Sequence, residues 1–154
     1  MSLVPSWAPN IHPFVIHFPI VLIVIAAAVE LMDVLFDRPA WLGEAATSLY
    51  IAGAVAAVAA YFTGAQAAST VLIPGMAHPF VAEHRSWALV TTWYCAAAVA
   101  IRFAARAAGV PRARSLRALL LAVGLVAVLL LQQTAERGAR LVYQFGTGVI
   151  AGPR

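Results

Sequence analysis

The chain has 154 residues, of which 63% are hydrophobic and only 10% are charged, and its mean hydropathy is +0.89. A soluble domain of this size carries about a quarter charged residues, so this composition excludes a soluble globular enzyme and a disordered chain. The single cysteine, Cys95, excludes a secreted disulfide scaffold. The net charge of +4 comes from ten arginines, and in so apolar a chain it indicates membrane orientation and not nucleic-acid binding. The sequence predicts an integral membrane protein.

Four apolar stretches are long enough to cross a hydrocarbon core of about 30 Å, which takes about 20 helical residues. They are predicted at 13–35, 45–68, 79–106 and 115–135, and prolines, glycines and polar residues bound them. We expect the first to be retained and not cleaved as a signal peptide, because no Lys or Arg precedes it. The expected fold is all-α, a single four-helix transmembrane domain over 1–154. Its end, 136–154, is predicted to be an interfacial or re-entrant segment.

The arginines predict the orientation of these spans. Four spans place both termini and the second connection on one side, with Arg85, Arg137, Arg140 and Arg154. The other side carries Arg38, Arg102, Arg106, Arg112, Arg114 and Arg117. Because short basic loops stay in the cytoplasm, we expect both termini to lie outside.

A tetrapeptide occurs twice in the chain. His-Pro-Phe-Val stands at 12–15 and again at 78–81, and a second histidine follows each copy, at His17 and His84. Each copy places proline at the first helical position, where its missing N–H is not needed. The first and third spans therefore begin with the same chemistry. The match favours two helical hairpins packed as parallel repeats, and a chance match of four residues is the alternative.

The four histidines therefore lie on one side of the protein. Residues five or six apart point to different faces of a helix, so at most one histidine of each span faces the bundle interior. His17 is expected inside, because it lies in an apolar run, and His84 is its partner. Helical bundles hold haem b between two facing histidines, so His17 and His84 are predicted as axial ligands, with a purely structural role as the alternative. His12 and His78 are expected to be wet helix caps, and they are weaker candidates for a copper or zinc site.

Other residues complete this hypothesis. Small side chains on the second and fourth spans make room for a cofactor or for close helix packing: Gly53, Ala57, Ala60, Gly64 and Gly124. Cations for the haem propionates are expected from Arg85, Arg137 and Arg140. The chain has no Cys-x-x-Cys-His motif for c-type haem, and no hydrolase triad, P-loop or dinucleotide fingerprint.

At the opposite side, Glu30 and Asp33 share one face of the first span. Arg102, late in the third span, is placed to neutralise one of them. We expect an intramembrane salt bridge that holds the two parallel spans together, and a proton or ion path is the alternative.

Several of these segments together resemble the bacterial domain-of-unknown-function family 2231, small membrane proteins of four helices. The resemblance covers nearly the whole chain, from the opening NIHPFVIHFPIVLIVIAAAVELMD through Gly64 and the Glu-His-Arg at 83–85 to the closing ERGARLVYQFGTGV. Its most specific parts are His-Pro…His-Phe-Pro at 12–19 and Gly-x-x-Leu-Val-Tyr-x-x-Gly-x-Gly-Val at 138–149, although Ala139 stands where many members have glycine. Members of the family often occur beside or fused to c-type cytochromes and other redox modules.

The resemblance implies a multi-pass protein of the bacterial inner membrane and favours haem at the histidines. The first function hypothesis is a haem-b membrane subunit that passes electrons between an outer redox partner, such as a c-type cytochrome, and the quinone pool. The second is a cofactor-free accessory subunit that stabilises a larger redox or photosynthetic membrane complex. An electron-transfer or accessory role is favoured over a stand-alone enzyme.

Overall fold

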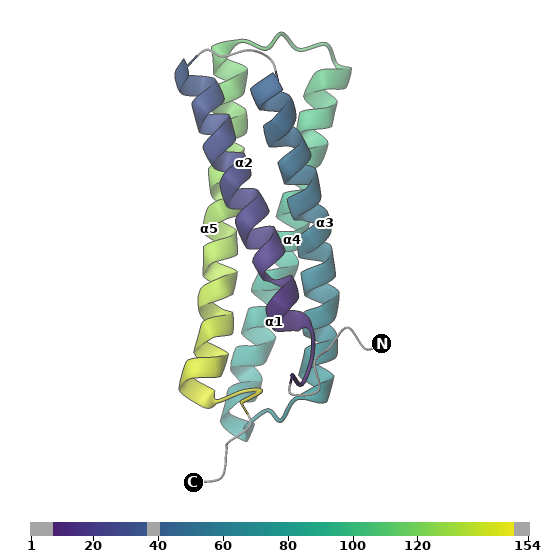
Figure 1. Ribbon diagram of the computed structural model, residues 1–154, viewed down its shortest axis with the longest axis vertical. Helices are drawn as coiled ribbons and strands as arrows, with labels where there is room; N and C mark the ends of the chain where they lie inside the picture. The colour runs from purple at the N-terminus through teal and green to yellow at the C-terminus, as the bar shows by residue number, and fades with distance from the viewer. Residues whose placement is uncertain (1–7, 37–40, 150–154) are drawn as a thin grey trace.

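The computed structural model describes residues 8–36 and 41–149, and all regular structure in these ranges is helical (Figure 1). In chain order the elements are α1 (His12–Val15), α2 (His17–Phe36), α3 (Trp41–Thr70), the short 3-10 helix η1 (Gly75–Ala77), α4 (His78–Ala107) and α5 (Arg114–Phe145). Four helical stretches are long and apolar enough to cross a membrane: His12–Phe36, Trp41–Thr70, Gly75–Ala107 and Arg114–Phe145. The prediction of four helices that could each span a membrane is confirmed.

The four long helices form an up-and-down bundle. Helix α2 packs against α3 and α5, and α4 packs against the same two helices, so α2 and α4 lie diagonally across the bundle. The beginning of α1 and the end of α5 lie at one end, here called the histidine end (Figure 1). The connection between α4 and α5 lies at the opposite end, here called the arginine end. This arrangement is the predicted all-α four-helix bundle.

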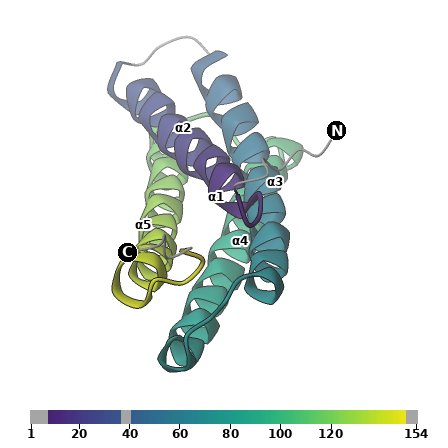
Figure 2. The same ribbon diagram turned by 60° about the horizontal axis from the view of Figure 1, so that its bottom comes forward.

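The first span contains a break. Helix α1 ends at Val15 and α2 begins at His17, with Ile16 in a turn between them. Proline at position 19 has no N–H for the carbonyl of Val15, and its ring crowds that carbonyl, so the helix is interrupted there. Helix α1 lies beside α3 and apart from α5 (Figure 2).

The fourth helix is longer than predicted, and this corrects the expected end of the fourth span at 135. Helix α5 continues to Phe145, so 136–145 are helix and not a separate re-entrant segment. Charged side chains support this extension, since Arg140 lies 3.5 Å from Glu136 of the same helix and Arg137 bonds Glu83 of α4 at 2.8 Å. The helix ends at Gly146, whose φ of 63° lies in the left-handed region that glycine adopts without strain. The last predicted residues, 150–154, lie outside the described ranges.

Small residues dominate the centre of the bundle, and large apolar residues face outward. Ile23, Ala26, Ala46, Cys95 and Ala127 belong to the buried core, together with Tyr50. Large exposed side chains occur on every long helix, including Met32, Phe62, Trp93 and Leu129. A soluble monomer rarely exposes so much apolar surface, whereas lipid tails solvate it well. The protein is therefore built to sit in a bilayer.

The predicted salt bridge between the first and third spans is confirmed. The Arg102 guanidinium of α4 donates to both carboxylate oxygens of Glu30 on α2, at 2.7 and 2.9 Å. Both side chains are buried, at 2% and 6% exposure, and the Arg102 guanidinium also stacks 4.0 Å from the Tyr50 ring centre. Because α2 and α4 are diagonal neighbours, this pair joins them through the middle of the bundle.

Candidate functional site

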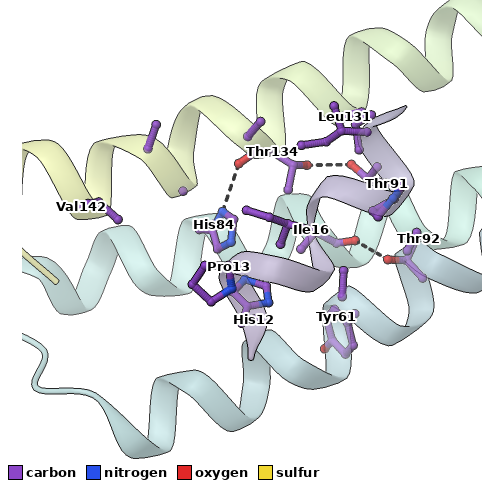
Figure 3. Close-up of a pocket in the computed structure, with 18 of the residues that line it drawn as sticks. His12, Pro13, Ile16, Tyr61, His84, Thr91, Thr92, Leu131, Thr134 and Val142 are labelled. Atoms are coloured by element: carbon purple, nitrogen blue, oxygen red, sulfur yellow. Dashed lines mark hydrogen bonds between the residues drawn. The ribbon is translucent and has the colours of Figure 1, made fainter. Parts of the chain in front are cut away.

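A cavity of about 370 Å³ lies inside the histidine end of the bundle. Side chains from α1, α2, α3, α4 and α5 line it, and no Arg, Asp or Glu is among them (Figure 3). Its α5 wall includes the exposed residues Ala135, Ala139 and Val142, so the cavity opens at the side of the bundle and not only at its end. Cofactor pockets of this kind have volumes of about 300–1,000 Å³ and mostly apolar walls.

His12 reaches this cavity from the first helical position of α1. Its Nδ1 lies 3.1 Å from the Thr63 hydroxyl oxygen on α3. The Thr63 hydroxyl donates its own proton to the backbone carbonyl of Ala59 or Ala60, at 3.0 and 3.1 Å. The hydroxyl oxygen therefore accepts from the imidazole, which places the proton of His12 on Nδ1.

His84 reaches the same cavity from the second turn of α4. Its Nδ1 lies 3.1 Å from the backbone carbonyl oxygen of Thr134 on α5. A carbonyl only accepts, so the proton of His84 also stands on Nδ1. The Thr134 hydroxyl bonds Thr91 of α4 at 2.8 Å, and each of these hydroxyls also lies within 3.2 Å of the Leu130 carbonyl. This network joins α4 to α5 directly beneath His84.

The two imidazoles are thus held through the same ring nitrogen, Nδ1. With Nδ1 of each ring protonated and bonded, Nε2 carries the lone pair, and neither Nε2 has a hydrogen-bond partner among residues 8–36 and 41–149. A histidine ligand to a metal is oriented in this way, by a hydrogen bond from its other nitrogen to an oxygen. The pair is prepared to bind a metal centre or to accept protons from a ligand.

A glycine makes room for each inward histidine. A Cβ placed on Gly64 of α3 would lie 2.9 Å from Cε1 of His12, and one placed on Gly138 of α5 would lie 3.1 Å from Cε1 of His84. Both distances are shorter than carbon atoms tolerate without movement. Gly64 was expected to make room for a cofactor or for close helix packing, and the group that lies against it is the His12 ring. Gly53 serves the alternative role of close packing, against Ile23.

The structure brings His12 and His84 together, and this corrects the expectation that His17 faces the interior. His17 is exposed on the outside of α2 and does not line the cavity, and His78 is exposed as expected. One histidine of each span faces inward, which agrees with the limit of at most one that the helical geometry set. An apolar run indicates how deep a residue lies, but it does not indicate which way the residue points. The break at Ile16 and the packing of α1 on α3 decide that His12 points inward.

The three predicted propionate partners do not line the cavity. Arg85 is exposed, and its Nε lies 3.5 Å from the hydroxyl of Tyr61, which is a cavity residue. Arg137 is bonded to Glu83 at 2.8 Å and stacks 4.2 Å from the Trp87 ring centre. Arg140 pairs with Glu136. Among them, Arg85 is the one linked to the cavity by a side chain that lines it.

The alternative of a copper or zinc site has no support in the described part of the chain. Its residues form no group of three or more His, Cys, Asp or Glu side chains that could hold a metal ion. His78 lies outside the cavity, so the four histidines do not converge.

Sequence reasoning missed the oxygen atoms that orient the two rings. The acceptors are the Thr63 hydroxyl for His12 and the backbone carbonyl of Thr134 for His84. A partial signal exists in the sequence, because each acceptor precedes a glycine that faces the same ring, by one residue for Gly64 and by four for Gly138. That spacing becomes informative only when the facing helix is known.

The comparisons with known proteins agree with this architecture. The family described as predicted membrane protein, DUF2231, matches residues 8–151. No curated protein and no solved structure matches the chain. The match covers all four helices and both inward histidines, and the chain belongs to the DUF2231 family of membrane proteins.

Proposed function

We propose that this protein binds haem b in the cavity at the histidine end and transfers electrons, with His12 and His84 as the axial ligands. One observation carries the proposal. Two imidazoles from facing helices enter one apolar cavity with Nε2 of each ring available and Nδ1 of each ring bonded to an oxygen. Haem b is held in helical bundles by a histidine pair of this kind.

The residues present fit this cofactor in their chemistry. The donors are neutral imidazoles, the walls are apolar, and the lining contains no carboxylate that would compete for the metal. The oxygens of Thr63 and Thr134 would keep each ring in its orientation and increase its basicity as a ligand. Tyr61 and Arg85 stand at the edge of the cavity, where a propionate needs a donor. Bound haem would supply reversible one-electron chemistry.

The proposal includes a cellular setting. The histidine end would face the periplasm of a bacterial inner membrane, with both termini there, because five arginines lie in or beside the connection between α4 and α5 at the other end: Arg102, Arg106, Arg112, Arg114 and Arg117. A protein that is almost entirely helix within the membrane has little surface for a soluble substrate. We therefore propose that it works with a partner, a c-type cytochrome or a redox or photosynthetic complex, and exchanges electrons with the quinone pool.

Absorbance tests the proposal directly. Protein purified from a haem-replete host should show a Soret band, and this band should be lost in His12→Ala and in His84→Ala. The matched controls are His17→Ala and His78→Ala, which remove exposed histidines of the same two spans and should keep the band. Circular dichroism of all four variants should show unchanged helix content, which separates loss of a ligand from loss of the fold.

Two outcomes contradict the proposal. If wild-type protein from such a host shows no Soret band, haem is not its cofactor, and the accessory-subunit hypothesis replaces it. If His17→Ala removes the band while His12→Ala keeps it, the ligand pair is wrong. Purification in mild detergent tests the partner, since a lone monomer with no co-purifying redox protein contradicts the subunit role.

A further inference from the structure

A second cavity of about 370 Å³ lies at the arginine end, among the last turns of α2 and α4 and the first turns of α3 and α5. Unlike the histidine cavity, it is lined by charged side chains. Four arginines and three carboxylates contribute to it: Arg102, Arg106, Arg112, Arg117, Glu30, Asp33 and Glu44. Among the described residues that line it, one positive charge is in excess.

These charges form two layers. The inner layer is buried: Arg102 pairs with Glu30, and Asp33, whose side chain is 3% exposed, lies 4.0 Å from Arg117 and 2.8 Å from Arg112. Buried charges with such close partners are neutralised by one another.

The outer layer lies at the mouth of the cavity and is far more exposed. The Arg106 side chain is 76% exposed, and its nearest carboxylate oxygen, on Glu44, is 3.9 Å away. The Arg112 side chain is 38% exposed and crosses above Gly43, where a Cβ would collide with the guanidinium. An exposed pair at such a distance contributes little binding energy, so Arg106 can exchange Glu44 for another anion at low cost.

The mouth also has an apolar side. Phe103 and Val110 line the cavity and are 53% and 45% exposed. Phe103 belongs to α4, one of the four helices that can span a membrane, and it lies one turn before the end of that helix. The mouth therefore combines exposed arginines with exposed apolar side chains near the end of a helix that can span a membrane, a combination that suits the phosphate level of a bilayer.

We propose that this cavity binds the headgroup of an anionic phospholipid, with Arg106 contacting the phosphate and with Phe103 and Val110 contacting the upper part of an acyl chain. The chemistry recognised is a phosphate that carries a net negative charge. A free phosphate ion carries the same charge but has no apolar group that could contact Phe103 and Val110, so the structure favours the lipid. Basic pockets between membrane helices hold anionic lipids by this combination.

Native mass spectrometry of the detergent-purified protein, titrated with phosphatidylglycerol or with phosphatidylcholine, tests the proposal. Wild type should retain phosphatidylglycerol preferentially. Arg106→Gln should lower that affinity about fivefold, the effect of one basic residue at an anionic surface. Glu44→Gln should raise the affinity, because it removes the competing carboxylate. Both positions are exposed, so neither change threatens the fold.

Arg114→Gln is the matched control, since Arg114 is exposed in the same region but does not line the cavity, and it should leave retention unchanged. Three results would overturn the proposal. Equal retention of both lipids shows no headgroup selection, and an equal loss in Arg114→Gln and Arg106→Gln shows diffuse surface charge. Displacement of the lipid by inorganic phosphate at the same concentration shows a free-anion site.

Discussion

The two ends of the bundle enclose cavities of the same volume, about 370 Å³ each, but the two cavities accommodate their polar side chains in opposite ways. At the histidine end the polar groups are neutral, and each imidazole keeps one nitrogen available after bonding the other to an oxygen. At the arginine end the polar groups are charged, and the buried ones pair with one another.

This difference separates a binding role from a structural role. A buried ion pair uses its charge on its partner and has little left for a ligand, so Glu30 and Arg102 hold helices together. A neutral imidazole in an apolar cavity still has a lone pair that can bind a ligand. Burying such a polar ring costs free energy, and packing alone does not explain why it is buried. Ligand chemistry is therefore expected at the histidine cavity and at the exposed mouth of the arginine cavity, and not at the buried pairs.

The largest effect on stability should come from breaking a buried pair at the arginine end. Arg102→Met leaves Glu30 charged and unpaired inside the bundle, and we expect the free energy of unfolding to fall by about 3–5 kcal/mol. Denaturation in detergent, followed by circular dichroism, measures this. The double variant Glu30→Leu with Arg102→Met removes both charges and should recover most of the loss. A single variant as stable as wild type would contradict the structural role.

The next effect concerns the space for His12. Gly64→Leu should lower the free energy of unfolding by about 1–3 kcal/mol, because the new side chain displaces the imidazole. The loss should appear although leucine favours a helix over glycine by about 1 kcal/mol. Ala65→Leu is the matched control, since Ala65 is the next residue and is exposed, and it should be neutral. If Gly64→Leu is at least as stable as wild type, His12 does not occupy that space.

A smaller effect tests the orientation of the two imidazoles. Thr63→Val removes the hydroxyl that accepts from His12 and should lower the free energy of unfolding by about 0.5–1.5 kcal/mol. Nitrogen NMR of the histidine rings should show a changed proton distribution for His12. Thr134→Val is the contrasting variant, because His84 bonds the backbone carbonyl there and should keep its proton on Nδ1. Identical His12 spectra in wild type and Thr63→Val would argue against the assigned hydrogen bond.

The smallest effect is expected for an exposed pair at the histidine end. Arg140→Gln breaks the contact with Glu136 within α5, where both side chains are about half exposed. The free energy of unfolding should change by about 0.3–0.5 kcal/mol, as for other pairs on one helix face, and less at high salt. Thermal melts at two salt concentrations measure it. A loss as large as that of Arg102→Met would mean that exposure does not distinguish the pairs of this protein.

Much of the fold follows from the sequence by local rules. The four spans were predictable because each is a long apolar stretch, and proline at positions 13 and 79 marks two helix starts. The pair of Glu30 with Arg102 was predictable because an ionised side chain inside a membrane needs an opposite charge, and few basic residues lie at the depth of Glu30. The end of α5 was not predictable from the sequence. The polar residues of 136–145 resemble a loop, and the bond from Arg137 to Glu83 of α4, which supports the helix there, depends on the tertiary structure.

The sequence by itself determined that the protein lies in a membrane, that it has four helices, and that at most one histidine of each of two spans faces inward. These properties depend on sums along the chain and on the fixed turn of a helix, which neighbouring helices do not alter. Only the tertiary structure decided that His12 and not His17 meets His84, and that Thr63 and Thr134 orient the rings. The rotation of a helix about its axis is set by the side chains packed against it, and those come from distant parts of the chain.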